Sequence, residues 1–396
     1  MEKIHPLLDK EKQIKARAYE QEKRIFNFLG IVLTAIVQLF FYFSGLSQNI
    51  AGWSILSSFI WTFIFFMIIY SMLQTIIKFP ISYIANFSHE HKYGFSRQSK
   101  KEWTWDHTKA YLLSLIFGII VYGALLIIFQ KFPVFWWLIA GGFIAIFSVI
   151  LSTIFPVLIM PIFHHYDKIE DEELKSTLYG ILDDAGINVE GFYREDTSRK
   201  TTKENAMLAG MGATKRVILA DNIIKHMGID EIKTVLAHEI GHYKKNHIIK
   251  YILTGTILQI FAFFLLNRIM TVLFPMFLTG FRENLALLPM LLFYLLLIDL
   301  VVLNIIQNWI GRHYEREADI EALRLSKDPK AFQKAMAGLA NRNLSNAYPS
   351  LWVKLMYYSH PPVGERLEMA EQFIEEDSRG QGFKGSSDPS THPQYL

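Results

Sequence analysis

Long apolar runs alternate with polar stretches along this chain of 396 residues. Six of the runs carry almost no charge and are long enough to cross a bilayer as a helix, which takes about 20 residues. The pattern predicts spans at residues 26–46, 54–77, 110–130, 134–160, 250–274 and 285–310. The fold class is therefore predicted to be mainly α, with several membrane-spanning helices.

Between the fourth and fifth predicted spans, the chain has the pattern of a soluble protein. Residues 170–185 place apolar side chains at helical spacing, and Gly186 follows as a C-cap. Two short apolar runs, at 205–209 and 216–220, flank a turn that contains Gly210 and Gly212. They predict an antiparallel hairpin whose edge strand could pair with an extended peptide.

The same pattern divides the whole chain into six parts. We expect a charged amphipathic segment at 1–24, four spans at 25–163 with a polar loop at 78–109, a soluble part at 164–250, two further spans at 250–310, a second soluble part at 311–376, and a disordered tail rich in Ser, Gly and Pro at 377–396.

Composition supports a membrane protein and excludes several other classes. Hydrophobic residues make up 51% of the chain, and the mean hydropathy is +0.22. The net charge of +3 is too small and dispersed to indicate nucleic-acid binding. The absence of cysteine excludes disulfides and thiolate metal sites. Because residues 1–24 are highly charged, we expect the first apolar run to be an uncleaved span rather than a signal peptide.

The distribution of basic residues predicts the orientation in the membrane. Residues 1–24 carry seven Lys or Arg and the loop 78–109 carries six, whereas the alternate connections carry at most one each. The positive-inside rule then places both termini and the soluble segments in the cytoplasm. The membrane would be the bacterial inner membrane, or the endoplasmic reticulum in a eukaryote.

One helix, predicted to start near Asp230, carries the sequence His-Glu-Ile-Gly-His at 238–242. Residues four apart lie on one face of a helix, so His238 and His242 can bind the same metal ion. Glu239 is then placed to act as general base toward a metal-bound water and afterwards as acid toward the leaving amine. The alternative is a surface helix with two solvated histidines.

A catalytic zinc ion takes three protein ligands, so a third must lie elsewhere in the chain. Glu315 is the candidate, on a helix that we expect Gly311 to open. Asp319, one turn further on, could accept a hydrogen bond from a ligand histidine, or could be an ordinary solvated acid. The predicted cofactor is one Zn²⁺ ion.

Other residues stay open at this level. His360 and Arg366 could stabilise a developing oxyanion, although residue type alone makes them ordinary surface residues. Asp299 lies deep in the sixth predicted span and needs either a partner or a wet cavity. The polar segment 90–98 could be a simple solvated connector.

Taken together, these motifs resemble the type I CAAX prenyl endopeptidases, which are integral-membrane zinc gluzincins. The resemblance covers residues from about 14 to 370. It is carried by Glu90 with Gly94-Phe-Ser and Gln98, Phe155-Pro-Val-Leu-Ile-Met-Pro161, Asn205-Ala206 with Gly210, His238 to His247, Glu315 with Asp319, and His360-Pro-Pro with Arg366.

The resemblance implies a helical barrel around a large water-filled chamber, fused to a gluzincin core with a short hairpin. Asn205, with Ala206 beside it, matches a strand position that contacts substrate near the metal. His360 and Arg366 match positions that stabilise substrate and transition state. The implied partners are membrane lipids and a peptide or protein substrate that is prenylated or membrane-anchored.

Two departures leave the substrate open. Family members typically have seven spans, whereas six are predicted here, and the missing one corresponds to the first. Members also occur in bacteria, which generally lack protein prenylation. A quality-control protease for membrane proteins is therefore one alternative. A transporter or lipid-binding protein with a vestigial site is another, against which the retained Glu239 argues.

Overall fold

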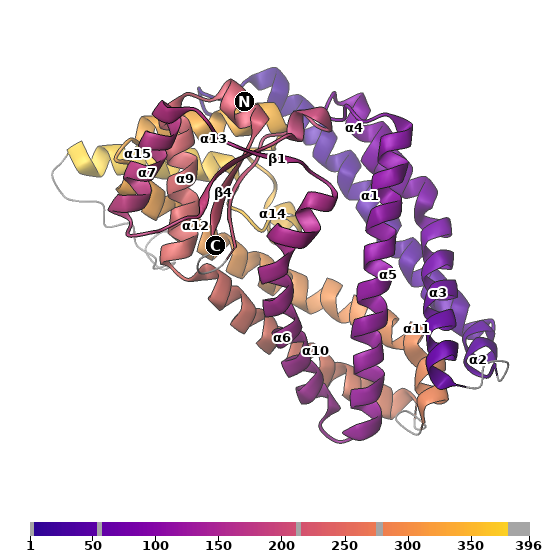
Figure 1. The fold of residues 1–396 in the computed structure, drawn as a ribbon. Coiled ribbons are helices and arrows are strands. Elements are labelled where there is room, and N and C mark those ends of the chain that lie inside the picture. The colour runs from indigo at the N-terminus through magenta and orange to yellow at the C-terminus, as the bar shows by residue number, and fades with distance from the viewer. Residues whose placement is uncertain (1–3, 54–57, 211–214, 275–279, 379–396) are drawn as a thin grey trace. The chain divides into compact units, whose positions relative to one another are not determined.

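A computed structural model describes residues 4–53, 58–210, 215–274 and 280–378 (Figure 1). The chain forms two compact units. The sheet unit comprises Met1–Gln21, Ser152–Lys250 and Ile306–Leu396, and the helical unit comprises Glu22–Leu151 and Tyr251–Ile305. Each unit is described by itself.

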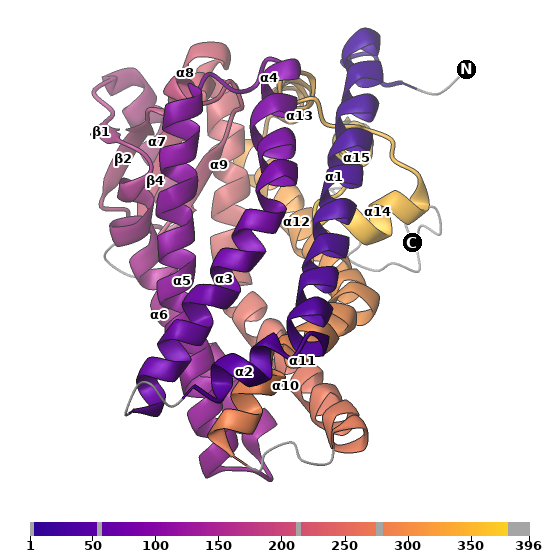
Figure 2. The same cartoon turned by 90° about the vertical axis from the view of Figure 1, so that its right-hand side faces the viewer.

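Long apolar helices form the helical unit. The described elements that contribute to it are α1 (Lys10–Phe43), α2 (Leu46–Ala51), α3 (Phe59–Tyr83), α4 (His89–Lys92), α5 (Lys100–Lys131), α6 (Trp136–Ile154), α10 (His247–Leu273) and α11 (Phe281–Ile298), with π-helical turns η1 (Ile84–Ser88) and η6 (Asp299–Leu303) (Figure 2). Six helical stretches in the described residues are long and apolar enough to cross a membrane, the same number as the predicted spans. Residues 54–57 of the second predicted span lie outside the described part.

The helices extend further than the apolar runs that revealed them. α1 begins at Lys10, so the expected amphipathic segment and the first span form one continuous helix. The expected loop 78–109 is also mostly helical: α3, η1 and α4 run on to Lys92, and α5 begins after Ser99. A hydropathy pattern shows which residues of a helix are apolar enough to lie in the bilayer. It does not show at which residue the helix begins or ends.

A small four-stranded sheet lies in the sheet unit. Its strands, in spatial order, are β1 (Tyr166–Lys168), β2 (Gly191–Glu195), β4 (Arg216–Ala220) and β3 (Ala206–Ala209). β2 and β4 run parallel, and β3 pairs antiparallel with β4. The predicted hairpin and its edge strand are thus confirmed. Gly210 adopts a left-handed φ of 89°, while Gly212 lies outside the described residues.

Helices pack around this sheet and bury an apolar core. They are α7 (Glu172–Asp184), α8 (Asp221–His226), α9 (Ile229–Lys244), α12 (Asn304–Ser326), α13 (Pro329–Asn343) and α15 (Val363–Ser378). The short helix α14 (Leu351–Tyr357) belongs to the same unit and lies outside this core. α9 packs against β3, α7 and α13, and α13 packs against α15. Side chains such as Leu178, Ile240 and Phe332 are completely buried, each contributing about 1.5–3 kcal/mol of hydrophobic stabilisation.

The expectation that Gly311 opens a helix is wrong. α11, η6 and α12 follow one another without interruption, so Gly311 lies inside α12. Its small size has another use: a Cβ atom there would lie 2.7 Å from the carbonyl oxygen of Ser359. Glycine at this position therefore lets the segment before His360 lie directly on α12. Of the expected disordered tail, residues from 379 onward lie outside the described part.

Candidate active site

The helix α9 carries the His-Glu-Ile-Gly-His sequence and is held in place by packing against the core of the sheet unit. Asp230 and Glu231 in its first turn complement the helix dipole. Apolar side chains on the opposite face, including Leu236 and Ile240, are buried in the core of the sheet unit. The helix therefore holds its polar face in a fixed position.

The helix α12 crosses α9 at very short range. A Cβ atom on Gly241 would lie 2.8 Å from the carbonyl oxygen of Ala318, a distance that real Cβ contacts do not show. Because Gly241 has no side chain, the two backbones approach closely next to His242. This contact brings the carboxylate of Glu315 to the two histidines.

Three side chains on these helices form a triangle of potential metal ligands. The Nε2 atoms of His238 and His242 lie 3.1 Å apart. Of the two carboxylate oxygens of Glu315, Oε2 lies 3.2 Å from Nε2 of His238 and Oε1 lies 3.3 Å from Nε2 of His242. A tetrahedral zinc ion with bonds of about 2.0–2.1 Å keeps its ligand atoms roughly 3.3–3.4 Å apart. The donor set and its spacing therefore fit one zinc ion.

A buried ion pair backs the first histidine. Asp319 Oδ1 lies 2.8 Å from Nδ1 of His238, and Arg366 donates from Nε to Oδ2 of Asp319 at 2.9 Å and from Nη2 to Oδ1. Burial disfavours the charged imidazole, but the hydrogen bond from His238 to Asp319 and the charge of that carboxylate raise the pKa of His238 to about 9. Without metal, the imidazole of His238 is therefore protonated and positively charged at neutral pH.

The edge strand β3 lies beside Glu239. The backbone N–H of Leu208 donates to Oε2 of Glu239 at 3.4 Å. The carbonyl of Asn205, in contrast, accepts from Ala220 on β4. Because backbone groups alternate in direction along an antiparallel strand, the N–H and C=O groups of Ala206 and Leu208 face the open edge. The side chain of Asn205 is exposed at the start of this edge.

His360 completes the cluster from the segment between α14 and α15. Its Nε2 lies 3.1 Å from Oε1 of Glu315, and 61% of its side chain is exposed. Arg312 holds the preceding turn by donating to the carbonyl oxygens of Lys354 at 3.0 Å and Tyr358 at 2.6 Å. Seven of the nine candidate residues thus meet at one place. Ala206 is the first residue of the adjacent strand β3, and Asn205 directly precedes it.

Sequence reasoning missed a set of hydrogen bonds between the N-terminal helix α1 and the segment that precedes His360. The carboxylate of Glu20 on α1 accepts from Tyr358 Oη at 2.5 Å and from the backbone N–H of Asn346 at 2.9 Å. Gln13, two turns earlier on the same helix, donates to the carbonyl oxygen of Ser345 and accepts from the backbone N–H of Ala347. The start of α1 therefore fixes the segment that leads to His360. No local signal in residues 10–21 indicates this.

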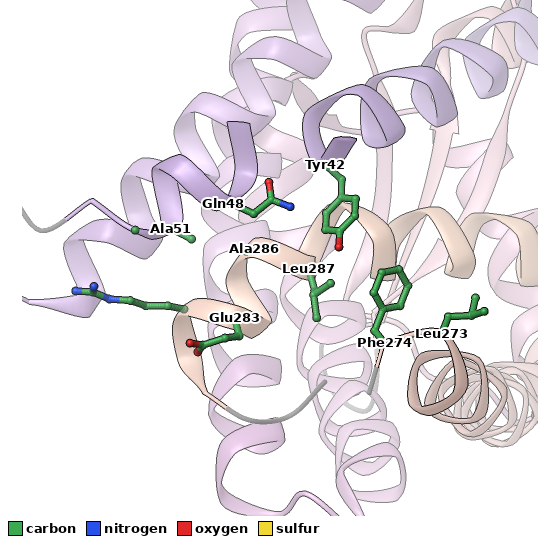
Figure 3. Close-up of a pocket in the computed structure, with 10 residues that line it drawn as sticks. Tyr42, Gln48, Ala51, Leu273, Phe274, Glu283, Ala286 and Leu287 are labelled. Carbon is green, nitrogen blue, oxygen red and sulfur yellow. The ribbon is translucent and has the colours of Figure 1, made fainter. Parts of the chain in front are cut away.

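The helical unit holds a separate pocket of about 570 Å³ (Figure 3). Tyr42, Gln48, Phe274, Glu283 and Leu287 are among the side chains that line it. None of the candidate catalytic residues lines it, so it is distinct from the metal site.

Two protein-family models match nearly the whole chain. Residues 2–165 match the model described as CAAX prenyl protease N-terminal, five membrane helices. Residues 168–374 match peptidase family M48. The first of these regions contains four of the six long apolar helices found in the described residues, one fewer than the five in that description.

Several known proteins are similar over most of their length. CAAX prenyl protease 1 of Saccharomyces cerevisiae is 31% identical over 320 residues, covering 76% of this chain and 70% of the yeast protein. An uncharacterized metalloprotease of Bacillus subtilis, YhfN, is 29% identical, with coverage of 90% and 85%. The crystal structure of S. mikatae Ste24p superposes with a TM-score of 0.81 at 25% identity, covering 93% of this chain and 90% of that one.

Proposed function

The chain belongs to peptidase family M48, and we propose that it hydrolyses peptide bonds with one zinc ion held by His238, His242 and Glu315. It is an integral, multi-pass membrane metalloprotease similar to CAAX prenyl protease 1. The observation that carries the zinc assignment is the cluster of His238, His242 and Glu315, whose nearest nitrogen and oxygen atoms lie 3.1–3.3 Å apart. Two imidazole nitrogens and a carboxylate oxygen are a ligand set that suits zinc.

Each remaining side chain has a role that follows from its contacts. When bound, zinc supplies a Lewis acid that lowers the pKa of water and polarises the scissile carbonyl. Glu239 takes the proton from the attacking water and returns it to the leaving amine. Asp319 holds His238 in the tautomer whose Nε2 is free of a proton, and Arg366 neutralises Asp319.

His360 supplies a hydrogen-bond donor or positive charge beside Glu315 for the developing oxyanion. Arg366, whose Nε and Nη2 donate to Asp319, contributes its positive charge from behind His238. The Nε2 atom of His360 is 3.1 Å from Glu315 and most of the side chain is exposed, so the ring can turn toward a bound substrate. Donors that are already in position for the developing charge usually give the largest single catalytic contribution.

The substrate peptide binds as an added strand on β3. The outward-facing N–H and C=O groups of Ala206 and the C=O group of Leu208 offer the hydrogen bonds, and Asn205 stands where such a strand would begin or end. Since Leu208 also donates to Glu239, a peptide on this edge lies next to the general base. Pairing through the backbone tolerates many sequences, so a second feature of the substrate must provide selectivity.

The similarity to CAAX prenyl protease 1 favours a prenylated or membrane-anchored protein tail as that substrate. The spans would then enclose a chamber that admits both peptide and lipid. By the distribution of basic residues, both termini and the site face the cytoplasm. Turnover of membrane proteins without a prenyl requirement is the alternative, favoured by the similarity to a bacterial metalloprotease.

A paired cleavage assay separates these substrates. Purified enzyme is given a farnesylated CAAX peptide and its unprenylated twin, with the Glu239→Ala variant as control. We expect the farnesylated peptide to be cut preferentially and the variant to be inactive. Equal cutting of both peptides would support the membrane-turnover alternative. Cutting by the Glu239→Ala variant would refute the proposed chemistry.

A further inference from the structure

The second ligand histidine has a buried neighbour that the mechanism above does not use. His247 is the first residue of α10, and its ring is 1% exposed. It follows Asn246, whose left-handed φ of 56° lies in the break between α9 and α10; asparagine tolerates this conformation better than most residues. Beyond this break, Nδ1 of His247 lies 2.9 Å from Nδ1 of His242.

Two further contacts fix the ring of His247. Its Nε2 lies 2.9 Å from Oε2 of Glu317 on α12. Its face stacks on the ring of Tyr314, with centroids 4.7 Å apart and planes at 13°. Glu317 in turn lies 3.4 Å from Nζ of Lys250. The imidazole of His247 therefore has little freedom to rotate away from His242.

Hydrogen-bond chemistry sets the direction of this chain of contacts. The Nε2 atom of His242 faces Glu315 and His238, so this nitrogen must be free of a proton to bind a metal. Its proton is then on Nδ1, which donates to Nδ1 of His247. A neutral His247 that accepts at Nδ1 carries its own proton on Nε2 and donates it to Glu317.

We propose that His247 and Glu317 form a positioning relay that fixes the tautomer and orientation of the metal ligand His242. This inference rests on the proposed function, because it takes His242 as a ligand. With this relay, the two ligand histidines differ in the partner that holds their Nδ1 atom. A charged carboxylate contacts His238 directly, whereas a neutral imidazole stands between His242 and Glu317.

The geometry also separates this role from direct metal binding. His247 meets His242 on Nδ1, whereas the ligand triangle lies on the Nε2 side. A metal ion held by His238, His242 and Glu315 would bind Nε2 of His242, on the edge of the ring opposite to the one that contacts His247. Partners that orient a ligand histidine typically contribute 10–100-fold to metal affinity.

Zinc affinity, measured by competition with a fluorescent chelator, tests the relay independently of turnover. His247→Phe keeps the ring stacked on Tyr314 but removes both hydrogen bonds, and we expect zinc binding roughly 10–100-fold weaker. His247→Asn places an amide oxygen near the position of Nδ1, so it should restore most of that loss. Glu317→Gln keeps an acceptor without the charge and should weaken zinc less than His247→Phe.

A matched control comes from another histidine–carboxylate pair in the sheet unit. His164 Nδ1 lies 2.8 Å from Oε1 of Glu195, and His164→Ala removes a contact of similar type that does not involve the ligands. We expect this variant to bind zinc as the wild type does. The absorption spectrum of the cobalt-substituted protein should shift in His247→Phe and stay unchanged in His164→Ala, which a general loss of stability would not produce.

The outcomes distinguish the relay from the proposed function. Stoichiometric zinc in the wild type with equal affinity in His247→Phe would overturn the relay and leave the protease assignment standing. Affinity in His247→Asn as low as in His247→Phe would also overturn it. A wild type that binds no zinc would refute the proposed metal centre, and the relay with it.

Discussion

Asp319 Oδ1 lies 2.8 Å from Nδ1 of His238, with both side chains almost completely buried. This carboxylate fixes which imidazole nitrogen is free for a metal. Asparagine has the same size, but its side chain can turn either its oxygen or its NH₂ group toward Nδ1 of His238. The tautomer of His238 is then no longer fixed. We expect Asp319→Asn to weaken zinc binding about 10–100-fold, measured by chelator competition. Unchanged affinity would mean that Asp319 has only a structural role.

Zinc binding should release a proton near neutral pH. Burial opposes the charged form of His238, but Asp319 raises its pKa to about 9 in the metal-free protein, so a metal must displace this proton. Calorimetry at pH 7.5 in buffers of different ionisation enthalpy should count about one proton released per zinc. Release of none would contradict the protonated state of His238.

The same raised pKa makes the stability of the metal-free protein depend on pH. A group whose folded pKa lies above its unfolded value stabilises the fold when protonated. This contribution is therefore complete below about pH 6.5 and is lost as pH rises through about 9. Thermal unfolding of metal-free protein should show a falling midpoint across this window, and the fall should be smaller in Asp319→Asn.

Removing His360 should affect turnover more than metal binding. Its Nε2 contacts Glu315 at 3.1 Å, yet most of the side chain is exposed. We expect His360→Ala to lower kcat by about 10²–10³-fold, as for the loss of one oxyanion donor, while zinc content stays stoichiometric. A normal kcat in this variant would remove His360 from the catalytic groups.

The close crossing of α9 and α12 should not tolerate a methyl group. Gly241→Ala places a Cβ atom 2.8 Å from the carbonyl oxygen of Ala318, and overpacking of this kind costs about 1–3 kcal/mol. We expect a lower melting temperature and weaker zinc binding. Gly180→Ala on α7 is the matched control, since nothing lies within 4 Å of its Cβ. That change should be neutral or stabilise by about 0.5–1 kcal/mol; equal melting temperatures in the two variants would contradict the crossing.

The sequence predicts elements with strong periodicity and misses those that depend on tertiary contacts. The spacing of His238 and His242 is a property of one helix, so it is visible in the chain itself. The strands β1 and β2 have only three and five residues and pair with distant partners, which leaves no clear local pattern. Both were missed.

The relay shows the same limit at the site. His247 stands five residues after His242, a spacing that does not share a helical face. Only the left-handed turn at Asn246 brings the two rings together. Glu317 lies two residues from both Glu315 and Asp319, and a helical projection places it on a different face from them. The crossing of α12 with the start of α10 is what gives it a role.

The order of the site residues along the chain has a consequence for biosynthesis. The potential zinc ligands are separated by two apolar helices, and His360 and Arg366 come after all six. A nascent chain on the ribosome therefore has no complete site until Arg366 has been translated, after all six of these helices. We therefore expect no cleavage of neighbouring chains, or of the chain itself, while it is still being inserted.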